Sequence, residues 1–420
     1  MKVADHNPES AQGCLAAYRQ HSSPATADRY QLLGGGGVEI RGAGATVELN
    51  NGRQLIDMGS YAVPLFGHRP AAVADEVRAT LDRLPVTTRL VANPVAAAYL
   101  RELSNYVNRA DLTRVWLGLN GTDAVEAALK FAVAATRVPS ILAVKGGYHG
   151  KSLFSLAATW DPARKEPVRG VLPDARHIDV AANAVARALD ERPAAALIFE
   201  PLQAEGGGHL IPAEVMRQWV ADAHDRGTFV IADEIQCGFH RCGPVSLALE
   251  AGADVDAVLL GKPLGGGVMP LSAVVTTDRL WGDMATDPYL HTATFSAHPL
   301  SCAAGRAALQ LAVTTCEERS IAEQRLSRLV ADVAEQCDVV QRAEAHGLFA
   351  VFDVGTAEQA GAVVTHAARA GLLVAPCTTS PTSIRLLPSL TTTPEQWHRA
   401  QSIMCRALGR AARIRPATAA

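Results

Sequence analysis

Two apolar runs, each followed by charged residues, decide the fold: FVIADEIQCGFHRCG at residues 229–243 and VLLGKPLGGGVMP at residues 258–270. Short, continuous apolar runs of this kind are typical of strands that are buried on both faces of a parallel sheet. Further runs, VWLGL, ILAV, ALIF and SAVV, alternate with helical stretches between Val115 and Thr276. Strands that alternate with helices predict an α/β domain with a mostly parallel central sheet.

The segments on either side of this region have a different pattern. Residues 38–58 read as short strands broken by the turn Asn50-Asn51-Gly52, and the C-terminal part combines Ala/Leu-rich helical patterns with the strands LFAVFDV and SIRLLP. We therefore expect an N-terminal segment of residues 1–58 with a helix and short antiparallel strands, a large domain of residues 59–305 and a C-terminal domain of residues 306–420. The first and last segments are expected to form a smaller α+β domain.

Composition narrows the range of partners. The 420-residue chain carries a net charge of −3, without the basic excess that binding to nucleic acid requires. Its N-terminus is polar, with Asp5 and Glu9, and no apolar run reaches the roughly 18–20 residues that span a bilayer. Cys237 and Cys242 lack a second Cys/His pair at zinc spacing. We expect a cytoplasmic protein with reduced cysteines that binds small molecules and has no metal, membrane or nucleic-acid site.

The charged residues at the ends of the two apolar runs are candidates for chemistry. Lys262 follows a buried strand, and desolvation lowers the pKa of an amine and makes it a nucleophile towards aldehydes. The chain has only six lysines against 33 arginines, which argues that Lys262 is retained for more than its charge. Asp233 ends the other run and can pair with a buried cation. The alternatives are a lysine that snorkels to water and an aspartate that only caps a helix.

Two further stretches carry candidate binding groups. In LGLNGTDAVEAALKFA, residues 117–132, Gly121 and Thr122 open a helix whose free N–H groups can bind phosphate, although an ordinary helix cap also fits. In GGYHGK, residues 146–151, Tyr148 follows a strand and can present its ring to a ligand, although loop packing is a common role for such a residue.

Together, these motifs and the stretch ALIFEPLQAEGGGHLIP at residues 196–212 resemble the class III aminotransferases, a fold type I group of enzymes that use pyridoxal 5'-phosphate (PLP). The resemblance extends from about Val38 to Leu408. It implies that Lys262 binds PLP as a Schiff base and then moves the substrate proton, so Lys262 and Asp233 are the catalytic residues. Asp233 is expected to bind the pyridine nitrogen and Gln236 the phenolic oxygen, while Ile235 and Tyr148 pack on the two ring faces.

The resemblance also implies how the phosphate is held. Gly121 and Thr122 are expected to bind it at the helix start. Thr294 in HTATFSAHPLSCAAG, residues 291–305, matches a threonine that reaches the phosphate of the neighbouring subunit, which implies a homodimer with shared active sites. His298 and the pair Ser296-Ala297 differ from the family's usual residues in this segment.

Four residues are implied to bind the substrate: Tyr61, Lys151, Glu205 and Arg385. Arg385 in SIRLLPSLTTTPEQ matches an arginine that binds the substrate carboxylate, and Glu205 matches the glutamate that pairs with it when the substrate has no carboxylate there. Tyr61 and Lys151 indicate an amino-acid substrate with a second amine or carboxylate. The residues after Tyr61, namely Pro64, Leu65 and Phe66, are expected to make the pocket more apolar.

The function that the resemblance implies is transfer of an amino group between an amino acid or ω-amine and a 2-oxo acid. The same fold and the same Lys and Asp also serve racemases, decarboxylases and enzymes that make or break bonds at Cβ or Cγ. These alternatives differ in the shape of the pocket, so the sequence leaves them open. A binding protein without enzymatic activity gives no reason for Lys262 and Asp233 to occur together at buried strand ends.

Overall fold

The central sheet of the computed structural model, which describes residues 10–414, contains seven strands. They lie in the order β4 (Arg114–Gly118), β12 (Ser272–Thr276), β11 (Ala257–Leu260), β10 (Phe229–Asp233), β7 (Ala196–Phe199), β5 (Ile141–Val144) and β6 (Ala175–Ile178). Only β12 runs antiparallel to its neighbours, β11 and β4, so the expected mostly parallel sheet is confirmed. The edge strand β6, with the sequence ARHI, was not among the predicted strands because it lacks an apolar run.

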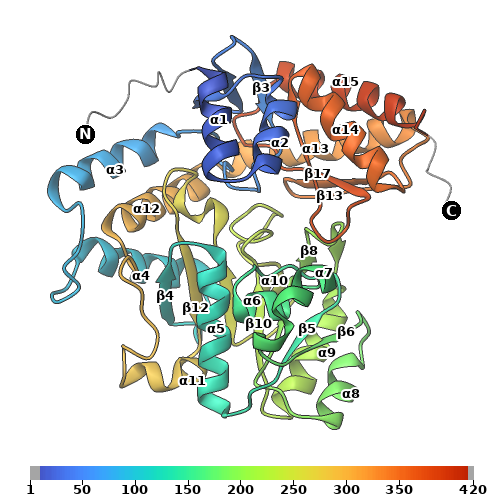
Figure 1. Ribbon diagram of the computed structural model, residues 1–420. Coiled ribbons are helices and arrows are strands. Elements are labelled where there is room, and N and C mark those ends of the chain that lie inside the picture. Colours follow the sequence, from blue (N-terminus) through green and yellow to red (C-terminus); the bar gives the residue numbers. More distant parts are fainter. Residues whose placement is uncertain (1–9, 415–420) are drawn as a thin grey trace.

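Alternate residues of each central strand pack on opposite faces of the sheet. In β10, Phe229 and Ile231 belong to a cluster with α5 (Gly121–Thr136), while Val230 and Ala232 pack with residues of α9 (Ala213–His224) on the other face. Figure 1 shows α5 lying along the face of this sheet. Because side chains alternate along a strand, Asp233 projects on the same side as Phe229 and Ile231. The apolar pattern of the strand therefore directs this carboxylate towards the α5 side.

Other helices surround the sheet and extend the core. They are α3 (Ala71–Arg83), α4 (Pro94–Val107), α6 (Leu153–Ala158), α7 (Pro162–Lys165), α8 (Ala184–Glu191), α10 (Leu247–Glu250), α11 (Asp278–Trp281) and α12 (Pro299–Thr314). Two strands, β8 (Leu202–Gln203) and β9 (His209–Leu210), form a small antiparallel pair directly after β7. Among the described residues, no helix is long and apolar enough to cross a membrane.

The two ends of the chain meet in a smaller α+β region, as expected from the sequence. One sheet joins β1 (Glu39–Ala43), β2 (Thr46–Leu49) and β3 (Gln54–Asp57) to the C-terminal strand β15 (Leu372–Leu373). A second contains β13 (Arg342–His346), β14 (Phe349–Asp353), β17 (Ser383–Leu386) and β16 (Ala375–Pro376). Figure 1 shows these strands beside the helices α1 (Ala11–His21), α2 (Pro24–Gly34), α13 (Cys316–Gln336), α14 (Ala357–Ala370) and α15 (Pro394–Ala411).

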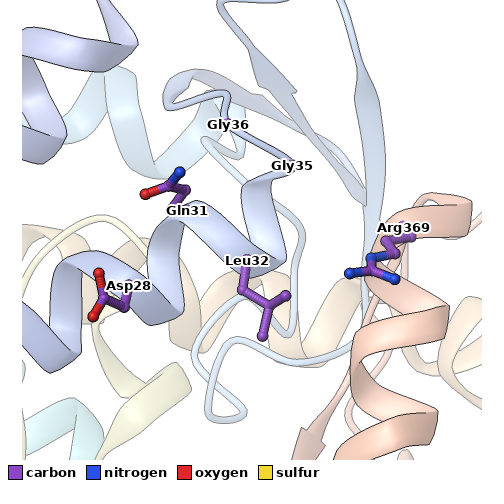
Figure 2. A pocket seen from close by; sticks show the side chains of 6 residues that line it. All are labelled: Asp28, Gln31, Leu32, Gly35, Gly36 and Arg369. Atoms are coloured by element: carbon purple, nitrogen blue, oxygen red, sulfur yellow. The ribbon is translucent and has the colours of Figure 1, made fainter.

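Arg53 connects the N-terminal helices to the C-terminal region. Its guanidinium donates to the carbonyl of Gly34 at 2.9 Å and to those of Ala368 and Arg369 at 2.7 and 3.2 Å. These carbonyls lie at the C-terminal ends of α2 and α14, where a cation also interacts favourably with the helix dipole. Figure 2 shows an open surface pocket between these two helix ends, lined by Leu32 of α2 and Arg369 of α14.

We predict that Arg53→Met lowers the free energy of unfolding by about 1–3 kcal/mol, because two helix ends lose charge-assisted hydrogen bonds. Arg19→Met is the matched control, since Arg19 pairs with Asp28 of α2 at 2.6 Å but both side chains are largely exposed. We expect that control to change stability by less than about 0.5 kcal/mol. Urea denaturation followed by circular dichroism measures both variants. Equal stability of the two variants would show that Arg53 does not join the helices.

Candidate active site

Asp233 lies buried at the end of β10 and is held by two donors. Its Oδ2 is 2.7 Å from Nδ1 of His149, and its Oδ1 accepts from the backbone N–H of Ile235 at 3.2 Å. The His149 side chain is fully buried, and its Nε2 has no hydrogen-bond partner among the described residues. His149 stands in the quoted stretch GGYHGK, but sequence reasoning assigned it no role because its contact with Asp233 spans 84 positions.

Glu234, the next residue, takes the helix-capping role that was the alternative for Asp233. Its carboxylate accepts from the backbone N–H groups of Leu247 at 2.7 Å and Ala248 at 3.0 Å, and from the hydroxyl of Ser246. These donors lie at the start of α10. Burial raises the pKa of Glu234 to about 7, although the hydrogen bonds oppose this shift. The two neighbouring acids therefore have different roles. Glu234 caps α10, and Asp233 projects on the α5 side of the sheet.

Lys262 follows β11 and begins a short 3-10 turn, residues 262–265, with a φ of 45°. Few residues other than glycine adopt such a left-handed conformation, and those that do are concentrated at functional sites. Burial lowers the pKa of the Lys262 amine, and the positive charge of Arg385 acts in the same direction. The carboxylates of Glu205 and Asp233 oppose the shift. An amine with a lowered pKa is available as a nucleophile and as a proton carrier.

Glu200 is a second buried acid at a strand end, and sequence reasoning missed it. It follows β7 and accepts from the backbone N–H of Tyr148 at 2.7 Å. Burial raises its pKa well above the usual value, and the nearby charge of Asp233 acts in the same direction. By accepting this hydrogen bond, Glu200 fixes the loop that carries Tyr148.

The first turn of α5 lies close to the residues that follow β10. A Cβ atom on Gly121 would lie 2.8 Å from Cγ2 of Ile235, and one on Gly261 would lie 3.0 Å from the same atom. A Cβ on Gly150 would lie 2.6 Å from the hydroxyl of Thr122. Three glycines therefore allow these segments to approach one another, and this places Thr122, Ile235 and the loop of Tyr148 around one end of the helix.

Arg385 and Glu205 form a buried pair next to these strand ends. Nη2 of Arg385 lies 3.1 Å from Oε1 of Glu205, and the same oxygen accepts from the amide of Gln236 at 3.3 Å. Nη1 of Arg385 donates to the carbonyl of Pro376 at 2.5 Å. The ring of Tyr61 lies 5.0 Å from the guanidinium carbon, a distance that permits a cation–π interaction.

The remaining predicted residues lie farther out. Lys151 is exposed, and its ammonium is 6.0 Å from the centre of the Tyr148 ring. Thr294 is exposed on the described chain, in the loop before α12. Leu65 and Phe66 are both buried in the main core, where Phe66 packs edge-on against Phe239 at 6.3 Å, and the apolar pocket expected from them stays a prediction. Their apolar character therefore serves packing of the chain after Tyr61.

Comparison with known proteins shows which family shares this arrangement. The family model "Aminotransferase class-III" matches residues 38–408. Putrescine aminotransferase of Pectobacterium atrosepticum is 30% identical over 406 residues, which are 92% of this chain and 86% of that protein. Acetylornithine aminotransferase of Methanopyrus kandleri is 33% identical over 325 residues, 76% of this chain and 82% of that protein.

Solved structures agree with the fold. An ornithine aminotransferase from Toxoplasma gondii superposes with a TM-score of 0.84 at 23% identity and covers 96% of both chains. A PLP-bound amine transaminase from an uncultivated Pseudomonas species gives a TM-score of 0.80 at 25% identity, covering 89% of this chain and 95% of that one. The resemblance inferred from the sequence is therefore confirmed, and the chain belongs to the class III aminotransferase family.

Proposed function

We propose that this class III aminotransferase transfers an amino group from an ω-amine or amino acid to a 2-oxo acid, with Lys262 as the residue that binds PLP. The observation that carries this assignment is the place of Lys262, which follows directly after the buried strand β11 and begins its turn with a φ of 45°. Desolvation lowers the pKa of its amine, and Asp233 is among the acids that act on it. The names of the two curated relatives, a putrescine and an acetylornithine aminotransferase, support an amine or amino-acid donor.

The residues around Lys262 fit PLP chemically. The cofactor needs an amine, an anion for its pyridine nitrogen and donors for its phosphate. Lys262 provides the amine and Asp233 the anion, and the buried hydrogen bond from His149 orients that anion. The first turn of α5 carries backbone N–H groups that have no partner within the helix, and these suit a phosphate. We propose that Gly121 and Thr122 hold the phosphate there.

When bound, PLP supplies a carbonyl carbon that takes up the amino group and a ring that draws electrons from the substrate carbon. Asp233 stabilises positive charge at the ring nitrogen, and its burial strengthens this interaction. The amine of Lys262 holds and moves the proton of the substrate's Cα. Ile235 and Tyr148 exclude water from the two faces of the site, and the amide of Gln236 is a donor for an anionic oxygen.

We assign the substrate carboxylate to Arg385. Its guanidinium is fully buried, and its Nε and Nη2 have no hydrogen-bond partner among the described residues. A buried arginine with free donors is suited to a carboxylate, which it can bind through two hydrogen bonds. Glu205 neutralises Arg385 when the substrate carries no carboxylate at that end. Tyr61 covers the guanidinium, and Lys151 at the rim is placed to meet a more distant acidic group.

We also propose a homodimer in which Thr294 reaches the phosphate of the partner subunit. The loop of Thr294 is joined to another exposed loop, because Arg89 donates to the carbonyl of Ala293 at 2.5 Å. Two apolar side chains of the Arg89 loop are largely exposed: Leu90 is 88% and Val91 is 72% exposed. Such residues are normally covered by a partner. The eight free thiols agree with the cytoplasm as the compartment.

The function is tested with putrescine as donor and 2-oxoglutarate as acceptor, since only the acceptor carries carboxylates. We predict that Arg385→Leu slows amination of 2-oxoglutarate by about 30-fold or more, the loss expected for a buried carboxylate contact. Deamination of putrescine, measured alone in a single turnover, should change by less than about threefold because no carboxylate is bound in that step. Formation of glutamate and of the oxo product is followed by chromatography.

Two results would count against the assignment. Equal losses in both half-reactions would show that Arg385 is structural. If a panel of amines and amino acids reacts with the holoenzyme and yields no oxo product, the chain instead carries out one of the other PLP reactions, such as racemisation, elimination or bond formation at Cβ or Cγ.

We predict that sedimentation detects a dimer and that Thr294→Val weakens PLP retention by roughly tenfold, because one hydrogen bond to a charged phosphate is lost. Thr292→Val is the matched control, since the Thr292 hydroxyl contacts Arg89 of its own chain. Equilibrium dialysis measures the retained cofactor in both variants. An active monomer, or equal PLP retention in the two variants, would contradict the shared site.

A further inference from the structure

We infer that Thr378 is a positioning residue that determines how readily Arg385 accepts a substrate carboxylate. The inference rests on the proposed roles of Arg385 and Glu205 and adds a residue that neither the sequence motifs nor the comparisons single out. Thr378 lies in the loop between β16 and β17, and Arg385 lies in β17 itself. The short segment from β16 to β17 therefore carries both Arg385 and Thr378, the residue that contacts the partner of Arg385, Glu205.

Thr378 holds one oxygen of Glu205 with two hydrogen bonds. The backbone N–H of Thr378 donates to Oε2 of Glu205 at 2.8 Å, and the Thr378 hydroxyl donates to the same oxygen at 2.6 Å. Glu205 is only 3% exposed, so water does not replace these donors if they are removed. A buried carboxylate that loses a donor bears a large part of its desolvation penalty.

The other oxygen of Glu205 is held less firmly. Its contacts are the amide of Gln236 at 3.3 Å and Nη2 of Arg385 at 3.1 Å. The contact with Arg385 lacks hydrogen-bond geometry, since Nη2 and Nε of Arg385 are both buried without a hydrogen-bond partner. Oε2 of Glu205 thus has two short hydrogen bonds from Thr378, whereas Oε1 is held by the charge of Arg385 and one longer hydrogen bond from Gln236.

The contacts with Thr378 affect the cost of separating the pair. A substrate carboxylate that binds Arg385 competes with Glu205 for the guanidinium. Glu205 then remains a buried anion, stabilised by Thr378 and Gln236 alone. The Thr378 hydroxyl lowers the free-energy cost of this separation, because it compensates Glu205 independently of Arg385. Without the hydroxyl, Glu205 depends more on Arg385, and the ion pair becomes harder to open.

A neighbouring residue keeps the loop in place without the Thr378 hydroxyl. The Thr379 hydroxyl donates to the carbonyls of Gly146 and Glu205, both at 2.9 Å, and the Thr379 N–H donates to the Glu205 carbonyl at 3.0 Å. Thr378→Val therefore removes one donor from the Glu205 carboxylate and leaves the loop attached. We expect this substitution to weaken the binding of substrate carboxylates and to leave the fold unchanged.

The first test measures binding without turnover. The holoenzyme is titrated calorimetrically with glutarate, a dicarboxylate that has no amino or oxo group. The Kd of Thr378→Val should be roughly tenfold higher than that of the wild type, because one hydrogen bond to a charged group is lost. Thr378→Ser keeps the hydroxyl and should restore the wild-type Kd. Thr382→Val is the matched control, because the Thr382 hydroxyl in the same loop donates to Asp353 at 3.0 Å instead. We expect it to bind glutarate like the wild type.

The second test separates KM from kcat. For L-glutamate as donor, Thr378→Val should raise KM roughly tenfold and change kcat by less than about twofold, because the Glu205 contact affects binding and not the proton transfer. For putrescine, which has no carboxylate, KM should stay within about twofold of the wild type. A structural defect would move both substrates together and would also appear in the melting temperature.

Arg385→Leu distinguishes the proposed role of Arg385 from the proposed role of Thr378. If that variant binds glutarate as tightly as the wild type, the proposed role of Arg385 is wrong. If Arg385→Leu loses glutarate binding while Thr378→Val retains it unchanged, Arg385 keeps its role and the inference about Thr378 is wrong. A tighter Kd in Thr378→Val would also overturn it, since the hydroxyl would then hinder and not assist the opening of the pair.

Discussion

Desolvation of the half-buried Lys262 amine sets the charges that the surrounding residues must supply. Removing an ammonium from water costs free energy, so the fold must either neutralise the amine or surround it with anions. Burial lowers the pKa of Lys262 and so favours the neutral amine, while the carboxylates of Glu205 and Asp233 favour the charged form. The nearby Glu200, whose own pKa burial raises, acts on the amine in the same direction as these two carboxylates. The result is an amine that can exchange a proton and attack a carbonyl.

The alternation of side chains along the strands places these groups. Ile198 and Ile231 pack against the cluster of α5, and the residues two positions after them, Glu200 and Asp233, project on the same side. The same helix begins at Gly121, close to Ile235. The strand pattern that buries apolar side chains thus also places two acids on the same side of the sheet. The alternation of residues along β7 and β10 therefore determines both the packing of the core and the side of the sheet on which the two acids lie.

Much of this could be predicted from the sequence, since buried strands and the residues that follow them are local patterns. The parallel sheet, Lys262 and Asp233 were identified in this way. Glu200 has the same signal, a polar residue directly after an apolar run, and applying that rule to ALIF would have found it. The contacts of His149 with Asp233 and of Thr378 with Glu205 join positions 84 and 173 residues apart, and no local pattern reports them. Leu65 packs in the core, and its apolar character alone does not distinguish this position from one in the lining of the pocket.

Attachment of PLP to Lys262 underlies every role proposed for the site, and mass spectrometry can locate that attachment. The holoenzyme is reduced with borohydride, which makes the bond between cofactor and lysine permanent, and is then digested and sequenced. We predict the added mass on Lys262 alone, and no labelled peptide from Lys262→Arg. Lys165 is the internal competitor, because burial lowers its pKa to about 8. A label on Lys165 or another lysine, with Lys262 unmodified, would contradict the account.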